Sequence, residues 1–457
     1  MTLIEDLASA LPADALVLDP DIIEPYRYDR AETVTPGRPA AVVRARCTAD
    51  VQAVMRVATA HRVPVVPRGA GTGLSGGSAA VDGCITLSTE RMRRIEIDPA
   101  AMVAVVEPGV LNAEVKAAAR AHGLWYPPDP SSFEICSIGG NMATNAGGLC
   151  CVKYGVTTDY VLGLEVVLAD GTVVRLGGRT VKDVAGYDLK RLFVGSEGTL
   201  GIITSATLRL RPLPPPSSTV VATFADVVDA GRAVASVMGQ LRPSALELMD
   251  RTAVRAVEAQ LRMGLDESCG ALLLGRSDAG GAQSSRDAAV IEAACAEAGA
   301  TYVAATDDED EGEQLMAARR MAIPCVEKLG TVLIDDVGVP IPRIPALIRA
   351  VEEVSARTST VIAVIGHAGD GNFHPLVVFD RHDADATARA EEAFGAVMDD
   401  ALALGGTITG EHGVGTLKGP WLQPQLGPDV VALSRRIKDA LDPLGILNPG
   451  KALDREP

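Results

Sequence analysis

The stretch at residues 63–78 constrains this chain more than any other, because it holds five glycines within the nine residues 69–77. Glycine adopts backbone angles closed to other residues and lets a ligand approach the main chain. Successive N–H groups in such a loop form a concave site that binds anions. A merely flexible loop is the alternative, but Pro67 and the placement of Thr72 and Ser75 among the glycines indicate a shaped loop. We therefore predict a cradle for a diphosphate.

The loop contains a Gly-x-Gly-x-x-Gly pattern at Gly71, Gly73 and Gly76. In a dinucleotide-binding βαβ unit this pattern opens a helix, whose N-terminus meets the phosphates. Here the loop leads within a few residues to an expected strand at 84–87, so no helix of useful length fits. The cradle should therefore bind through loop N–H groups. We also expect Gly73 to need backbone angles that valine cannot adopt.

Composition narrows the class of protein. With 457 residues the chain can form two or three domains. No run of 18 apolar residues occurs, so we expect no transmembrane helix, and the N-terminus lacks the basic region of a signal peptide. The net charge of −17 disfavours nucleic acid and anionic membrane surfaces as partners. Eight cysteines without paired metal spacing suit free thiols in a reducing cytoplasm.

Two further clusters of small residues lie in the first half of the chain, at 138–148 and 195–201. Small side chains there indicate that a backbone or a flat ligand comes close. Asp170 and Gly171 form a hairpin turn signal between expected strands at 161–168 and 173–176. The other elements expected in this half are a helix at 48–61 with Thr48 as its N-cap, a helix at 111–122, and strands at 85–87, 102–106 and 202–211.

Four prolines within residues 212–218 mark the first domain boundary. Beyond it strands and helices alternate, which predicts an α/β or α+β domain with a sheet of modest size. The expected strands are 219–224, 245–249 and 271–275, and the expected helices are 227–241, 252–263, 285–298, 344–357, 385–404 and 430–441. The acidic run at 307–311 should be a solvated loop. Asp385 should cap the helix that begins with it.

Two motifs in the second half carry residue types suited to chemistry. A strand at 361–366 ends in His-Ala-Gly-Asp-Gly-Asn-Phe-His-Pro at 367–375, and residues 409–415 read Thr-Gly-Glu-His-Gly-Val-Gly. Two histidines and a carboxylate are a common ligand set for Zn²⁺ or Fe²⁺ with open positions. Buried, hydrogen-bonded histidines are the equal alternative. Neighbours on an extended backbone point to opposite sides, so Glu411 and His412 should face apart.

Six motifs, in the same order, resemble those of the flavoprotein subunit of glycolate oxidase and of the D-lactate and D-2-hydroxyglutarate dehydrogenases. They lie at 67–78, 137–148, 195–199, 367–375, 410–415 and 447–451, so the resemblance covers nearly the whole chain. It implies an α+β protein of the vanillyl-alcohol oxidase superfamily. A two-subdomain FAD-binding domain of the PCMH type would span 1–213, and an α+β substrate or cap domain with an antiparallel sheet and the metal site 214–415. A C-terminal helical segment, 416–457, would return to the flavin and pack on the FAD domain.

The resemblance also implies which residues contact FAD. The first glycine loop would hold the diphosphate, the second cluster the flavin and ribityl chain, the third the adenine half, and Asn448 the isoalloxazine edge. The residues at matching positions are Arg68, Gly69, Ala70, Gly71, Thr72, Gly73, Ser75, Gly76, Gly77, Pro130, Ser131, Ile138, Gly139, Asn145, Gly147, Gly148, Glu197, Gly198, Ile203 and Asn448. FAD should be bound noncovalently, because the first loop has no histidine or cysteine.

Further roles follow from the resemblance in the second half. His367, His374 and Glu411 would bind a divalent metal, with Zn²⁺ expected and Fe²⁺ or Mn²⁺ as alternatives. His412 would be the catalytic base, and Arg319 would bind the substrate carboxylate. Some 2-hydroxyglutarate enzymes have polar side chains where this chain has three apolar ones, which favours a small monocarboxylate substrate. These apolar positions are Ile323, Ile334 and Leu376.

The implied activity is FAD-dependent oxidation of a small 2-hydroxy acid, of glycolate or D-lactate type, by metal-assisted proton abstraction and hydride transfer to flavin N5. The electron acceptor is open. An iron–sulfur cluster would belong to a partner subunit, because this chain has no cysteine cluster. We expect a cytoplasmic protein, which would reach the inner membrane only through such a partner; a homodimer stays open. The alternatives are a D-2-hydroxyglutarate-type dehydrogenase and a non-redox FAD enzyme, such as an alkyl-glycerone-phosphate synthase.

Overall fold

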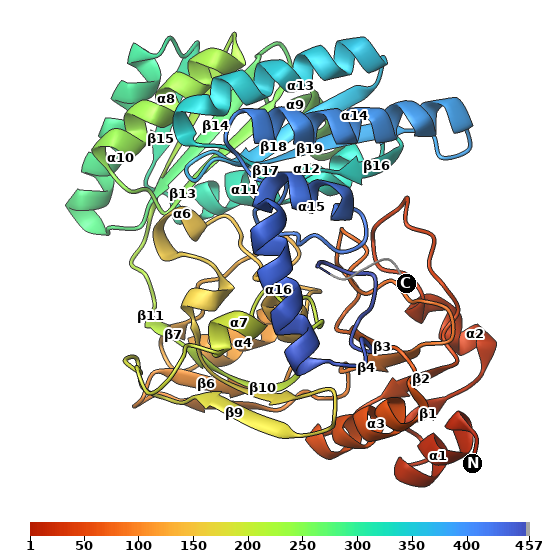
Figure 1. Ribbon diagram of the computed structural model, residues 1–457. Helices are drawn as coiled ribbons and strands as arrows, with labels where there is room; N and C mark the ends of the chain where they lie inside the picture. The colour runs from red at the N-terminus through yellow and green to blue at the C-terminus, as the bar shows by residue number, and fades with distance from the viewer. Residues whose placement is uncertain (454–457) are drawn as a thin grey trace. The chain divides into compact units, whose positions relative to one another are not determined.

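The structure is a computed structural model that describes residues 1–453, and the chain divides into two compact units. The first contains Met1–Gly147, Val156–Leu213 and the chain from Glu411 onward. The second contains Gly148–Gly155 and Pro214–Gly410. Each unit is built from segments that are distant in sequence, as the colours in Figure 1 show. The chain returns to the first unit between Gly410 and Glu411.

The first unit contains a four-stranded sheet in the order β1–β2–β4–β3. Its strands are β1 (Leu16–Val17), β2 (Ala41–Arg44), β4 (Ile85–Ser88) and β3 (Val65–Arg68), of which the last three are parallel. The predicted helix is confirmed as α3 (Thr48–His61), which connects β2 to β3. Its face of Val51, Val54 and Ala58 is fully buried. The predicted cap is wrong by one residue, because Cys47 is the N-cap.

A five-stranded antiparallel sheet forms the other half of this unit, in the order β5–β6–β10–β8–β9. Its strands are β5 (Ile95–Asp98), β6 (Val103–Val106), β10 (Ile202–Arg209), β8 (Val161–Val167) and β9 (Val173–Gly177). The predicted hairpin is confirmed, with Gly171 at φ +81° in its turn. α3 packs against β8 and β10, so one apolar core, which includes Val51, Val167 and Ile202, joins the helix to both sheets.

The C-terminal part of the first unit returns to the edge of the four-stranded sheet. Helices α15 (Gly419–Leu426) and α16 (Pro428–Leu441) lead to a short parallel bridge between Leu447 and Val65 of β3. Val65 donates its N–H to the Ile446 carbonyl, and Asn448 donates its N–H to the Val65 carbonyl. The end of the chain therefore extends the sheet beside the strand that enters the first glycine loop.

The second unit is an α+β domain around an eight-stranded antiparallel sheet. In order across the sheet, the strands are β15 (Tyr302–Thr306), β12 (Ser218–Phe224), β14 (Ala271–Ser277), β13 (Ala245–Asp250), β18 (Val361–His367), β19 (Asn372–Phe379) and β16 (Thr331–Ile334), with β17 (Val337–Gly338) also paired to β19. Four helices pack side by side along it in the order α10 (Gly281–Glu297), α8 (Val227–Gln240), α13 (Ile344–Thr358) and α14 (Ala384–Ala403) (Figure 1). The sheet is larger than predicted, because β15, β16, β17 and β19 were not expected.

Shorter elements complete both units. They are α1 (Leu3–Ala10), α2 (Pro20–Ile23), η1 (Glu24–Tyr26), α4 (Asn112–Arg120), β7 (Leu124–Trp125), α5 (Ile138–Thr144), α6 (Cys151–Tyr154), η2 (Thr157–Asp159), α7 (Lys190–Phe193), β11 (Arg211–Pro212), α9 (Arg251–Leu261), α11 (Glu309–Arg320), α12 (Ala322–Val326) and η3 (Ile341–Arg343). Within residues 1–453, no helix combines the length and the apolar character that crossing a membrane requires.

Two acidic segments fold differently from the prediction. The run at 307–311 is the start of α11: Asp308 is the N-cap, and three acidic residues form the first turn. Negative charge is favourable there, because helix N-termini carry unpaired N–H groups. In α14 the N-cap is Asp383 rather than Asp385, and its carboxylate accepts the N–H of Asp385.

Candidate active site

Arg68, at the end of β3, shapes the first glycine loop. Gly71 has φ +73°, and a Cβ there would lie 2.1 Å from Arg68 Nη2. The Arg68 guanidinium donates to the main-chain carbonyls of Tyr28 and Pro25. Gly73 is different: it is outside the left-handed region, and a Cβ would meet only Asp29, at 3.6 Å. The expectation that the fold needs glycine at position 73 is therefore wrong, whereas position 71 does need it.

Three glycine-rich segments meet in the first unit. No helix begins between residues 69 and 84, as predicted, but α5 begins in the second cluster, where a loop was expected. Ser137 caps α5, and its Oγ also accepts the N–H of Ala70 in the first loop, at 3.2 Å. At the other end of α5, the Ala143 carbonyl accepts the N–H of Glu197 in the third loop, at 2.9 Å. The three predicted FAD-contacting segments are thus joined by direct hydrogen bonds.

The other predicted FAD ligands lie on different elements. Ile138 and Gly139 are in α5, and Asn145 is its C-cap at φ +54°. Pro130 and Ser131 lie in the loop that follows β7, and Ile203 lies within β10, paired with Val166. Gly147 is the last residue of its segment in the first unit, and Gly148 opens the short segment that belongs to the second.

Asn448 is the fully buried side chain that links the chain end to the glycine loops. It has φ +44°, and its Nδ2 donates to the carbonyls of Gly77 and Glu197, at 2.9 and 2.7 Å. Within residues 1–453, its Oδ1 accepts no hydrogen bond. A buried amide oxygen without a donor is unfavourable. An external N–H donor, such as the edge of a flavin ring, would satisfy it, so this position fits FAD.

His367 and His374 form a buried pair in the second unit. His367 ends β18, and His374 lies in β19, where the register pairs it with Ile365. Side chains alternate along strands, so both histidines project from the same face of the sheet. Their ring centroids are 5.2 Å apart with an edge-to-face angle of 82°, and the side chains are 5% and 4% exposed. The strand carrying His367 was predicted, but the one carrying His374 was not.

Glu247 is a buried carboxylate beside this pair that the sequence analysis missed. It lies in β13 directly opposite His367, and both of its oxygens are 2.9 Å from His367 Nδ1. The same carboxylate is 2.9 Å from Arg319 Nη2, and both side chains of this ion pair are 1% exposed. A carboxylate on Nδ1 directs Nε2 towards a metal in many metal sites. The available signal was a single charge in the apolar run 245–249.

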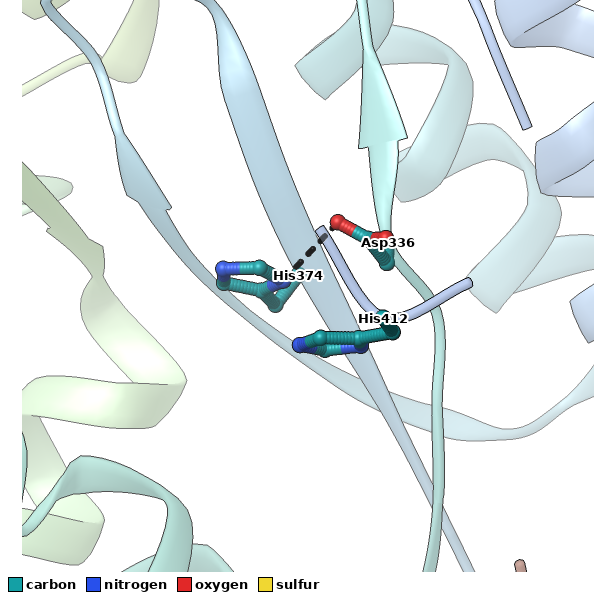
Figure 2. A group of neighbouring side chains, drawn as sticks. All are labelled: Asp336, His374 and His412. Atoms are coloured by element: carbon teal, nitrogen blue, oxygen red, sulfur yellow. Dashed lines mark ion pairs between the residues drawn. The ribbon is translucent and has the colours of Figure 1, made fainter. Parts of the chain in front are cut away.

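Asp336 is a second buried carboxylate that was missed, and it lies near His374. Its Oδ1 lies 3.6 Å from His374 Nδ1 (Figure 2). Its Oδ2 accepts hydrogen bonds from Thr409 Oγ1, at 2.6 Å, and from the Gly410 N–H, at 2.9 Å. Asp336 is fully buried. It therefore holds the chain at the residue immediately before Glu411.

Glu411 and His412 follow Gly410 directly in the chain. Glu411 Oε1 and His412 Nε2 are 3.8 Å apart, so the expectation that the two side chains face apart is wrong. The reason is the backbone, which bends at 411–412 and continues into Gly413 at φ +81° instead of staying extended. Within the second unit, the two imidazoles of His367 and His374 lie close together, and imidazole is a common ligand type for divalent metals.

Comparison with known proteins shows the family to which this chain belongs. Residues 39–177 match the family described as FAD binding domain, and residues 213–452 the family described as FAD linked oxidases, C-terminal domain. The chain is 41% identical over 434 residues to the glycolate oxidase subunit GlcD of Bacillus subtilis, covering 94% of this chain and 92% of that protein. It is 36% identical over 436 residues to a D-lactate dehydrogenase of Archaeoglobus fulgidus, covering 94% and 95%.

The fold has solved counterparts. The structure matches 4-ethylphenol oxidase from Gulosibacter chungangensis with a TM-score of 0.82 and 21% identity, covering 99% of this chain and 97% of that one. The class is that of FAD-linked oxidoreductases with a PCMH-type FAD-binding fold, as predicted. Within that class, this chain belongs to the FAD-linked oxidase family that includes glycolate oxidase subunits and D-lactate dehydrogenases.

Proposed function

We propose that this protein oxidises a small 2-hydroxy acid to the 2-oxo acid, with FAD as the hydride acceptor. The observation that carries the proposal is the buried cluster of Glu247, His367 and Arg319, which combines metal-type donors with a guanidinium in one place. Such a substrate has a hydroxyl to deprotonate and a carboxylate to bind. The two relatives described above are named for glycolate and D-lactate, which are both small 2-hydroxy acids.

The first unit would hold FAD noncovalently. Main-chain N–H groups of residues 69–77 would contact the diphosphate, and the buried Asn448 Oδ1 would accept a hydrogen bond from the flavin edge. The segments around α5 and Glu197 would line the rest of the cofactor, because they are hydrogen-bonded to the first loop. When bound, the flavin accepts a hydride from the substrate carbon.

His367, His374 and Glu411 would hold a divalent cation, with Zn²⁺ expected and Fe²⁺ or Mn²⁺ as alternatives. Glu247 and Asp336 support this assignment, since each lies near Nδ1 of one histidine and leaves the ring oriented through Nε2. Such a cation would supply Lewis-acid polarisation of the substrate hydroxyl. Hydrogen-bonded structural histidines without a metal are the competing interpretation, which metal analysis separates.

The remaining polar side chains have distinct tasks in this proposal. His412 would take the proton from the substrate hydroxyl, because an imidazole titrates near neutral pH. Arg319 would donate a forked pair of hydrogen bonds to the substrate carboxylate. Glu247 fixes the orientation of this guanidinium from the side that faces His367. The reaction would then need substrate orientation by Arg319 and proton removal by His412 in the same complex.

The surroundings of His374 favour a short substrate. Leu376 lies two residues further along the same strand, so it projects from the same face, and Ile334 pairs with it from β16. Both side chains are buried and apolar. A second substrate carboxylate against these two side chains would be costly, because neither of them offers a hydrogen-bond donor in place of water. A D-2-hydroxyglutarate-type substrate is therefore the less favoured alternative.

The electrons would leave through a separate acceptor. The cysteines of the sequence do not form an iron–sulfur motif, so an iron–sulfur cluster would reside on a partner subunit. The Bacillus subtilis relative is named a glycolate oxidase subunit, which supports an assembly with another protein. We propose a cytoplasmic location, with any contact with the inner membrane made through that partner.

The proposal is tested with purified flavoprotein, a panel of 2-hydroxy acids in both enantiomers and an artificial dye acceptor. Glycolate or lactate should reduce the flavin in anaerobic stopped flow, and 2-hydroxyglutarate should do so more slowly. Alcohols without a carboxylate serve as the matched control. Flavin reduction by those alcohols but by none of the acids would refute the proposal.

A further inference from the structure

Residues 413–415 follow His412 directly, and the third glycine loop holds them. The Glu197 carboxylate accepts the N–H of Val414 at 2.8 Å and the N–H of Gly415 at 2.7 Å. Glu197 is 7% exposed, so these bonds are shielded from water. A Cβ on Gly413 would lie 3.0 Å from the Glu197 carboxyl group, which makes the packing close on this side as well. One carboxylate therefore fixes the main chain within three residues of the proposed base.

The first glycine loop holds the same segment through Ser75. Its Oγ donates to the Gly413 carbonyl at 2.9 Å, and its own carbonyl accepts the N–H of Thr416 at 2.9 Å. A Cβ on Gly415 would lie 2.0 Å from that carbonyl oxygen. Both loops that are expected to contact FAD thus also position the chain that follows His412.

Glu197 is itself held in a strained backbone conformation. It has φ +52°, which is uncommon for a residue with a side chain. The Asn448 side chain donates to its carbonyl, and its N–H bonds to Ala143. Strained residues persist where the surroundings over-determine them, and they cluster at functional sites. In this conformation the Glu197 carboxylate bonds to the 413–415 segment.

We propose that Glu197 is a positioning residue, which sets the place of His412 through the main chain of residues 413–415. This role goes beyond a contact with the adenine half of FAD, which is what the resemblance implies for this position. The inference rests on the proposed function, because that function makes His412 the base. A misplacement of about 1 Å can lower a rate by about 10²-fold.

The test begins with Glu197→Gln. Glutamine keeps the size of the side chain but offers one acceptor oxygen and one NH₂ donor, so it cannot accept both N–H groups. Flavin reduction should slow by about 10- to 100-fold while the protein still purifies with FAD. Asp50→Asn is the matched control: Asp50 is also 7% exposed and accepts a main-chain N–H, from Arg46 at 2.9 Å, in the same unit. This control should keep the wild-type rate.

Two measurements distinguish a loss of His412 positioning from a general loss of structure. The first is hydrogen exchange by mass spectrometry, in which the peptide around residues 411–418 should exchange faster in Glu197→Gln because one of the two protected amides loses its acceptor. The second is a double-mutant cycle with His412→Ala. If Glu197 acts through His412, the double variant should be no slower than His412→Ala alone.

The outcomes are distinguishable. Unchanged exchange of the 411–418 peptide, or losses that add up in the double variant, would overturn the positioning role and leave the proposed function intact. A normal rate in His412→Ala would overturn the base assignment, and with it the positioning of that base. If Glu197→Gln does not fold, Ser75→Ala enters the same cycle, since it removes the hydroxyl that donates to the Gly413 carbonyl at 2.9 Å and lies 3.4 Å from the His412 carbonyl.

Discussion

Glu247 lies directly opposite His367 on the neighbouring strand, and its carboxylate is bonded to the Nδ1 of that histidine at 2.9 Å. The same carboxylate compensates the buried guanidinium of Arg319. One side chain thereby orients both a proposed metal ligand and the proposed substrate-binding group. Buried charges are stable only when they are paired, so the three side chains depend on one another for stability.

Glu247→Gln should therefore damage both stability and metal binding. Removal of one partner of a buried ion pair costs about 3–5 kcal/mol of unfolding free energy, which urea denaturation measures. Loss of the carboxylate on a metal-bound histidine lowers metal affinity about 10- to 100-fold, which calorimetric titration measures. Glu313→Gln is the control, because Glu313 pairs with Arg276 and is 51% exposed; it should change stability by less than about 1 kcal/mol. Equal effects of the two substitutions would contradict this account.

Gly71→Ala and Gly73→Ala should show which glycine is needed for the structure of the loop and which is needed for contact with the ligand. Gly71→Ala forces Arg68 aside and adds a Cβ at φ +73°, so it should lower both stability and flavin content. Gly73→Ala fits the protein itself, with its closest contact at 3.6 Å. If the diphosphate lies against this main chain, Gly73→Ala should keep a wild-type melting temperature but purify without the yellow flavin. Full flavin occupancy in that variant would remove Gly73 from the cradle.

Arg319→Lys should weaken substrate binding without loss of flavin. A lysine ammonium is a point charge and cannot form the forked bonds of a guanidinium. We expect kcat/KM for the preferred acid to fall about 10- to 100-fold, the equivalent of one charged hydrogen bond. Arg320→Lys, on the next residue of α11, is the matched control and should behave like wild type. An unchanged KM for every acid tested would exclude Arg319 from the site.

Glu411→Gln and His412→Ala should differ in metal content, although both should lose activity. A neutral amide is a poor ligand for a divalent cation, so Glu411→Gln should lose both metal and activity. His412→Ala should keep metal and FAD but lose about two to four decades in turnover, the usual contribution of a general base. Elemental analysis and stopped-flow flavin reduction on both variants measure this. Metal loss in His412→Ala with retention in Glu411→Gln would show that the two roles are exchanged.

Asp250, the N-cap of α9, should make stability depend on pH. Burial raises the pKa of its carboxyl to about 7, whereas an unfolded aspartate titrates near 3.9. The native state therefore binds the proton more tightly, and this stabilisation is complete below about pH 4 and lost as the pH rises through 7. Asp250→Asn keeps a good cap without the charge, so it should be more stable than wild type at pH 8 by on the order of 2 kcal/mol. Asp383→Asn, at the exposed cap of α14, is the control; a gain of the same size there would contradict the explanation.

Short sequence patterns predicted the elements that are stabilised by interactions between neighbouring residues. The apolar face of α3 and the Asp170-Gly171 turn gave elements that the structure confirms. α5 was missed because its two glycines suggest a loop, while the Ser137 cap and the flanking segments stabilise a helix. Glu247 and Asp336 were missed for another reason: they lie near the histidines only because β13 pairs with β18, and because β16, which precedes Asp336, pairs with β19. Motif spacing identified the histidines but not the carboxylates beside them.

The bond from Asn448 to Gly77 joins residues 371 positions apart in the chain. During synthesis the second unit is complete before the ribosome has made the segment that closes the first. The edge of β3, which leads into the first glycine loop, therefore stays unpaired until residues 446–448 have been synthesised. Such late, non-local closure slows folding and exposes a strand edge to aggregation. Flavin binding would consequently come late in folding, after residues 446–448 have bonded to β3 and to the first glycine loop.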